Sequence, residues 1–187
     1  MRLTTILAAA ALLVALGATR ATAQGIPIIF CAEQEPETPE CRGTDSFESL
    51  VGQDTRDVIR AFAGDDIVNA EAGKDDAFGG PGVDNMTGSF GDDRLFGGRG
   101  MDTLNDGLTP GGEVSTNDVD ELSGNRGNDI LRAEDDDFRD TIECGMGDED
   151  FAFFDVNRRT GRSDKVGDDC EFQNEFPEAA ETNEEAR

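Results

Sequence analysis

Residue types that common catalytic and binding sites require are absent or scarce in this sequence. It contains no histidine, which excludes HExxH metalloproteases and Ser-His-Asp hydrolases. The missing histidine and the lack of a C-x₂-C spacing among the 4 cysteines also argue against a zinc site. Only 16 lysines and arginines stand against 42 aspartates and glutamates, which gives a net charge of −26. Nucleic acid and anionic membrane surfaces would repel such a chain, so we expect its partners to be cations.

A long hydrophobic run is also missing. The apolar run over residues 3–16 is shorter than the roughly 20 residues that a membrane-spanning helix needs. It follows a charged start and precedes Ala21-Thr22-Ala23, which is the order found in a secretory signal peptide cut before Gln24. We therefore expect export with residues 1–23 removed, and no membrane insertion.

The four cysteines of an exported chain predict two disulfides, for which three pairings exist. The sequence-local pairing joins Cys31 to Cys41 and Cys144 to Cys170, and closes a small loop near either end of the central region. A stretch rich in proline and glutamate lies between the first two cysteines. We interpret residues 24–42 as a disulfide-linked lead-in.

One strong pattern is present, a repeat with a period of nine residues. Residues 61–105 divide into five nonapeptides, each with glycine fourth and aspartate sixth. The phase extends back to residue 43 and forward to residue 132. An irregular stretch around residues 106–117 keeps the register, so we expect the repeat structure to pass through it. The paired residues are Gly64 and Asp66, Gly73 and Asp75, Gly82 and Asp84, Gly91 and Asp93, and Gly100 and Asp102.

The eighth position of the repeat is apolar throughout. A Gly-x-Asp turn followed by one apolar residue between polar neighbours is typical of a tight turn and a very short strand. Two units form one coil of 18 residues, so the pattern predicts an all-β fold, a right-handed parallel β-roll or β-helix solenoid over residues 43–132. We expect a divergent repeat and cap over residues 133–172, and a disordered acidic tail over residues 173–187. The eighth-position residues are Leu50, Ile59, Val68, Ala77, Met86, Leu95, Leu104, Leu122 and Leu131.

Aspartates 18 residues apart would lie one coil apart on the same edge of this roll. The few inward apolar residues offset only part of the conformational entropy lost on ordering the repeats, and stacked carboxylates repel one another. A hard cation would relieve both problems, because it takes oxygens from aspartates and from carbonyls that glycine turns expose. Calcium fits these ligands better than magnesium, which demands a stricter octahedron.

Two nonapeptides carry a family resemblance. GGPGVD at residues 79–84 and GGRGMD at residues 97–102 match the G-G-x-G-x-D-x-U-x nonapeptide of haemolysin-type (RTX) calcium-binding repeats. The resemblance implies Ca²⁺ between loops of successive coils, held by aspartates and loop carbonyls, and it transfers calcium binding but not toxicity. The ligand candidates it gives are Gly79, Gly80, Gly82, Asp84, Gly97, Gly98, Gly100 and Asp102, with Asp66 stacked beyond them.

The other repeats depart from this nonapeptide at their first or second position. On the second edge we expect Asp57, Asp75 and Asp93 to stack, with Gly111 breaking the column before Asp129. Occupied sites should therefore be few. We place them near Asp66, Asp84 and Asp102 on one edge and near Asp75 and Asp93 on the other, with Asp129 as a further candidate.

Two other functions stay open. An extracellular structural or adhesive acidic solenoid would use its aspartates only for turns, would hold few or no metal ions, and would bind a cell-surface or matrix partner. A calcium-dependent enzyme acting on polysaccharides would need a catalytic base, yet carboxylates are so abundant that no pair stands out. We predict a secreted calcium-binding protein that is not an enzyme and whose folding is coupled to metal binding.

Overall fold

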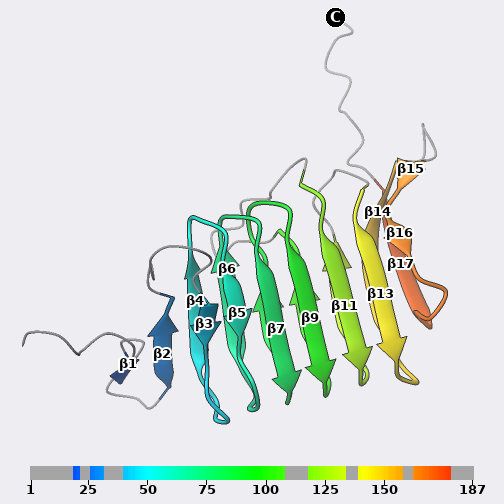
Figure 1. Cartoon of the computed structure of the whole chain (residues 1–187). Helices are drawn as coiled ribbons and strands as arrows, with labels where there is room; N and C mark the ends of the chain where they lie inside the picture. Colours follow the sequence, from blue (N-terminus) through cyan, green and yellow to red (C-terminus); the bar gives the residue numbers. More distant parts are fainter. Residues whose placement is uncertain are drawn as a thin grey trace, which may run out of the picture.

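The computed structural model describes residues 19–21, 26–31, 40–107, 118–133, 139–157 and 162–177, and every regular element in these ranges is a β-strand (Figure 1). None of these residues forms a helix with the length and apolar character needed to cross a membrane. The strands are β1 (Thr19–Ala21), β2 (Pro27–Phe30), β3 (Glu40–Arg42), β4 (Ser49–Gln53), β5 (Val58–Arg60), β6 (Ile67–Glu71), β7 (Asp76–Pro81), β8 (Asn85–Thr87), β9 (Arg94–Arg99), β10 (Thr103–Asn105), β11 (Glu121–Arg126), β12 (Ile130–Ala133), β13 (Thr141–Met146), β14 (Phe151–Asn157), β15 (Arg162–Ser163), β16 (Lys165–Val166) and β17 (Phe172–Pro177).

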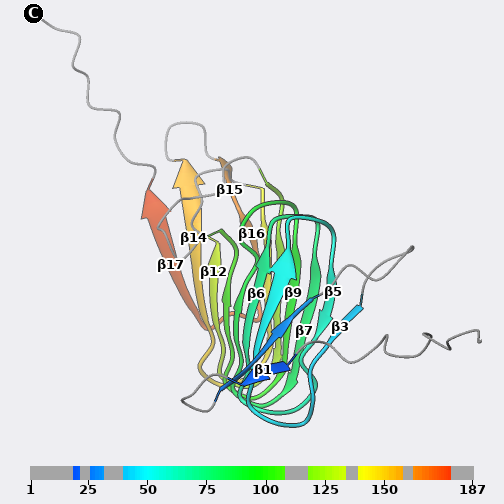
Figure 2. The same cartoon turned by 90° about the vertical axis from the view of Figure 1, so that its left-hand side faces the viewer.

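Successive strands alternate between two sheets that face each other (Figure 2). Sheet A has the order β1-β2-β4-β6-β8-β10-β12-β14-β15, with β17 paired to β14, and sheet B has the order β16-β13-β11-β9-β7-β5-β3. All pairs are parallel except β1 with β2 and β14 with β15. Each coil of the chain thus contributes one strand to each sheet, and the predicted parallel β-roll is confirmed.

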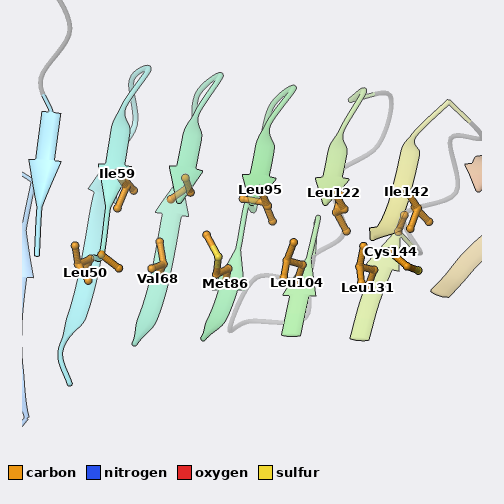
Figure 3. Packing of buried hydrophobic residues seen from close by; sticks show 14 of the residues in the cluster. Leu50, Ile59, Val68, Met86, Leu95, Leu104, Leu122, Leu131, Ile142 and Cys144 are labelled. Carbon is orange, nitrogen blue, oxygen red and sulfur yellow. The ribbon is translucent and has the colours of Figure 1, made fainter. Parts of the chain in front are cut away.

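The core is a double column of eighth-position side chains between the two sheets (Figure 3). In sheet A, Leu50 pairs with Val68 and Val68 with Met86, while Ile59 in sheet B pairs with Ala77. All nine predicted eighth-position residues are at most 1% exposed, as the sequence pattern predicts. Their neighbours on the same strands face outward, so the polar residues on either side remain in contact with water.

The irregular stretch after β10 does not keep the coil length. Leu95 pairs with Leu122 and Leu104 with Leu131, so these coils are 27 residues long where the others have 18. The prediction that the repeat structure passes through this stretch is therefore wrong. A physical reason lies in the sequence, because the eighth position of the nonapeptide starting at Asp106 is Glu113, which would place a carboxylate in the apolar core. Residues 108–117 themselves lie outside the described residues.

The solenoid extends beyond both ends of the predicted roll. The lead-in supplies β2 and β3, which pair with β4 and β5, and the predicted cap supplies β13, β14 and β16, which continue both sheets. Residues 173–177, which we expected in a disordered tail, belong to β17 and pair with β14. The rest of that tail, the cleavage site before Gln24 and most of the signal peptide lie outside the described residues.

Both predicted disulfides are present. Cys31 bonds to Cys41, which links the end of β2 to β3, and Cys144 in β13 bonds to Cys170, which precedes β17. All four cysteines are buried in the core cluster. The two disulfides therefore tie together the first and the last coils, where a strand has a neighbour on one side only.

Candidate metal centres at the turns

Glycine fixes the turns that connect the two sheets. At the fourth position of the repeat, Gly82 has a φ of 152° and Gly100 a φ of 137°, values that side-chain-bearing residues rarely adopt. A Cβ on Gly100 would also collide with the carbonyl oxygen of Gly82 in the preceding coil. Successive turns can therefore stack at close range, with their carbonyl groups facing the neighbouring coil.

The sixth-position carboxylates form one column along each edge of the solenoid. In both columns, a backbone N–H donates a hydrogen bond to the carboxylate one coil further on. The N–H of Asp66 donates to Asp84 Oδ1 at 2.8 Å, and that of Asp84 donates to Asp102 Oδ1 at 2.9 Å. The Asp66 column contains Glu48, Asp66, Asp84, Asp102, Asp129, Asp150 and Glu171, and the Asp57 column contains Asp57, Asp75, Asp93, Asp120, Asp140 and Asp164.

The structure corrects the expected position of Asp129. The N–H of Asp102 donates to Asp129 Oδ1 at 2.8 Å, whereas the N–H of Asp93 donates to Asp120 Oδ1 at 2.6 Å. Asp129 therefore continues the Asp66 column and not the other one. The Asp57 column, which we expected to break at Gly111, is continuous, because the additional residues leave the coil path before Asp120.

The second oxygen of most of these carboxylates is buried and has no hydrogen-bond partner among the described residues. Leaving a charged oxygen buried without a partner is costly, so each of these atoms is a candidate metal ligand. These atoms are the Oδ2 atoms of Asp66, Asp75, Asp84, Asp93, Asp102, Asp129 and Asp150.

Burial raises the pKa of the stacked carboxyl groups well above the usual aspartate value. It raises the pKa of Asp93 to about 8 and the pKa of Asp102 to about 7. It also raises the pKa of Asp75 to about 7 and those of Asp66 and Asp129 to about 6. Neighbouring carboxylates add to the rise, while the backbone N–H donors oppose it. Near neutral pH the columns thus hold poorly solvated negative charge, which a divalent cation would neutralise.

Backbone carbonyls converge on the same buried oxygens. A Cβ on Gly79 would contact Asp84 Oδ2 and would lie 2.6 Å from the carbonyl oxygen of Gly97. A Cβ on Gly124 would lie 2.5 Å from both Asp129 Oδ2 and the carbonyl oxygen of Cys144. The space beside each first-position glycine is therefore lined by carboxylate and carbonyl oxygens, which are the ligands that calcium prefers. These residues fit a calcium ion.

The sequence pattern did not identify one group of carboxylates. Ligand oxygens of Asp106, Asp120 and Asp140 lie within 4.8 Å of one another, and all three residues are buried. Asp106 stands where the repeats carry a first-position glycine or alanine, and Asp140 lies after the phase has slipped. The signal available in the sequence was an aspartate at a first position, next to a nonapeptide whose eighth residue cannot enter the core.

The model of one protein family matches the region that carries these columns. The RTX calcium-binding nonapeptide repeat matches residues 42–77, 78–105 and 114–137, with four copies. The chain belongs to this repeat family. No curated protein and no solved structure matches it. The interval between the second and third matched segments, residues 106–113, begins where the coil lengthens, so the RTX repeats lie in the coils that carry both columns.

Proposed function

We propose that this RTX repeat protein binds calcium ions between Gly-Asp turns of successive coils, and that binding is coupled to folding. The proposal rests chiefly on the series of buried Oδ2 atoms without a hydrogen-bond partner among the described residues, each beside a carbonyl oxygen of the neighbouring coil. Candidate ligands are the carboxylates of both columns and the carbonyl groups of the turn glycines. By analogy with other extracellular calcium modules, the dissociation constants should be about 10⁻⁴ to 10⁻³ M.

Coupling to folding follows from the electrostatics of the columns. Without a cation, the folded state must bury like charges one coil apart, whereas the unfolded chain leaves them in water. A cation that binds only the folded columns therefore shifts the equilibrium toward the folded state.

The experiment is a calcium titration of chelated protein followed by far-ultraviolet circular dichroism, with magnesium as the matched control cation. We expect β-structure to appear with calcium at submillimolar to millimolar concentrations and much less with magnesium. Equilibrium dialysis with ⁴⁵Ca²⁺ should give saturable binding over the same range. Unchanged circular dichroism together with no bound ⁴⁵Ca²⁺ would exclude a calcium-stabilised solenoid and favour the purely structural alternative.

We also propose that the chain is exported and has a binding or structural role without catalytic activity. Two disulfides support an oxidising compartment, and RTX repeats bind calcium without performing chemistry of their own. Intact mass of protein collected from the medium of an expressing culture should correspond to a chain that starts at Gln24. A screen for polysaccharide turnover should give no product; product that disappears in an Asp84→Ala variant would contradict the non-catalytic role.

A further inference from the structure

A groove crosses the outer face of sheet B toward the C-terminal ends of β7, β9, β11 and β13, the face shown in Figure 1. Its volume is about 830 Å³. One wall is formed by the residues in register at the ninth position of the repeat, from Phe78 to Glu143. The other wall is formed three residues further along each strand, from Pro81 to Met146. The walls are thus roughly 10 Å apart, which leaves room for one extended chain between them.

The floor of the groove is low because the second position carries glycine. Gly80, Gly98 and Gly145 form this floor together with Asn125. At the N-terminal end the same position is occupied by Phe62, whose side chain is 39% exposed and bounds a smaller neighbouring hollow. The groove is therefore shaped by the glycines of the repeat, although it lies away from both carboxylate columns.

The ninth-position wall is a stack of planar groups with one place left open. The Arg60 guanidinium lies 4.4 Å from the centre of the Phe78 ring, and that ring stacks on Phe96 at 5.0 Å. The next residue in register is Ser123, which is too small to cover the second face of Phe96. An apolar or aromatic side chain from a partner would complete the stack above Ser123.

The opposite wall is positively charged at the same level. Arg99 and Arg126 are exposed and in register on adjacent strands, with Pro81 and Met146 on either side. Neither arginine forms an ion pair with a described residue. Two guanidinium groups one strand apart favour a carboxylate between them.

Acidic groups mark the end of this positive region. Glu143 and Asp169 line the groove beyond the arginine pair. A carboxylate of a partner is therefore favoured beside Arg99 and Arg126 and disfavoured one coil further on. In a chain with a net charge of −26, this local reversal of sign gives the groove its selectivity.

We propose that this groove docks an extended acidic peptide segment of a partner protein, with a carboxylate on Arg99 and Arg126 and an adjacent aromatic side chain on the open face of Phe96. The apolar wall favours a peptide over a glycan, because Phe78 and Phe96 present a surface suited to an apolar side chain. The surface lies outside the calcium columns, so the proposal does not depend on how many ions they hold.

The test uses a short fluorescein-labelled peptide of glycine and serine that carries one phenylalanine next to one glutamate. Fluorescence anisotropy with the full chain in calcium should show saturable binding. Replacing the peptide's glutamate by glutamine, or changing Arg99→Ala and Arg126→Ala together, should weaken binding about tenfold or more. Phe96→Ala should weaken it to a similar extent.

Matched controls are Arg42→Ala on the same sheet and Phe30→Ala on the other sheet, both exposed, which should leave binding unchanged. Each variant is first compared with the parent by thermal unfolding in calcium. If a variant of the chain fails to fold, the pair of glutamate and glutamine peptides still decides the question. The proposal is overturned if the peptide does not bind saturably, or binds equally with glutamine. It is also overturned if a sulfated oligosaccharide binds through the arginine pair while the peptide does not.

Discussion

Replacing Asp102 by asparagine should change stability in opposite directions with and without calcium. Asparagine keeps the acceptor at Oδ1 for the N–H of Asp84, which donates to it at 2.9 Å, and removes the charge at the buried Oδ2. In chelated protein this charge is unfavourable, since burial raises the pKa of Asp102 to about 7. In calcium the same charge is a ligand. One side chain thus has two roles that depend on the cation.

The magnitudes follow from these two roles. One pKa unit corresponds to about 1.4 kcal/mol, so at pH values above the raised pKa the substitution should stabilise the chelated protein by about 2 to 4 kcal/mol. With calcium at roughly ten to a hundred times the dissociation constant, each bound ion contributes about 1 to 3 kcal/mol, and losing one ligand should remove most of one such contribution.

The assay is urea unfolding of the Asp102→Asn variant and the parent, once with chelator and once with saturating calcium. The midpoint should rise in chelator and fall in calcium, with unchanged m-values. Asp45→Asn is the control, because Asp45 is exposed and lies outside both columns. A shift of the same sign under both conditions would refute the reasoning that the column charge exists to hold a cation.

Three further predictions concern the turns and the columns. Gly97→Ala would place a Cβ 2.5 Å from Asp102 Oδ2, so it should lower the amount of ⁴⁵Ca²⁺ bound and the thermal midpoint in calcium, and equal binding would contradict the proposed ligand geometry. Phe62→Gly should stabilise the protein by about 1 kcal/mol in urea unfolding, because Phe62 has a φ of 76°; marked destabilisation would show that its side-chain contacts outweigh the strain. The raised pKa values of Asp93, Asp102 and Asp66 mean that folding without calcium takes up protons, so the stability of chelated protein should be greatest below about pH 4 and should fall as the pH rises through about 6 to 8. Denaturant midpoints that rise over that range in chelator would contradict this sign.

The sequence was sufficient to predict the coil and its core. A glycine turn and one apolar residue in every nine define both the period and the inward face, so the spacing alone assigns Leu50, Met86 and Leu131 to the core, where they are fully buried. The disulfide pairing was also predictable, because the sequence-local bridges close the two ends of a linear stack. These features depend only on residues that are near one another in the chain.

The register after the irregular stretch could not be predicted from spacing. A nine-residue phase is unchanged when one complete nonapeptide leaves the coil, so Asp120 and Asp129 kept their phase and exchanged their edges. The decision depends on which residue can enter the core, and Glu113 cannot do so without burying its charge. The ends were misjudged for a related reason. The strands β2 and β17 lie outside the regular repeat, and they are positioned by pairing with β4 and β14.

The expectation that only the full nonapeptide matches hold calcium treated both glycines as equally necessary, and the turn geometry separates them. At the second position, Phe62, Glu71, Ser89 and Asn125 adopt φ values of 72° to 83°, so the turn persists without glycine and the columns run through these coils. At the first position, the missing Cβ is what leaves space beside the buried Oδ2. A departure there, as at Ala61 before Asp66 and at Ala70 before Asp75, puts a methyl group into the ligand space. The sites beside Asp84, Asp102 and Asp129, whose first-position residues are glycine, should therefore bind calcium more tightly than those beside Asp66 and Asp75.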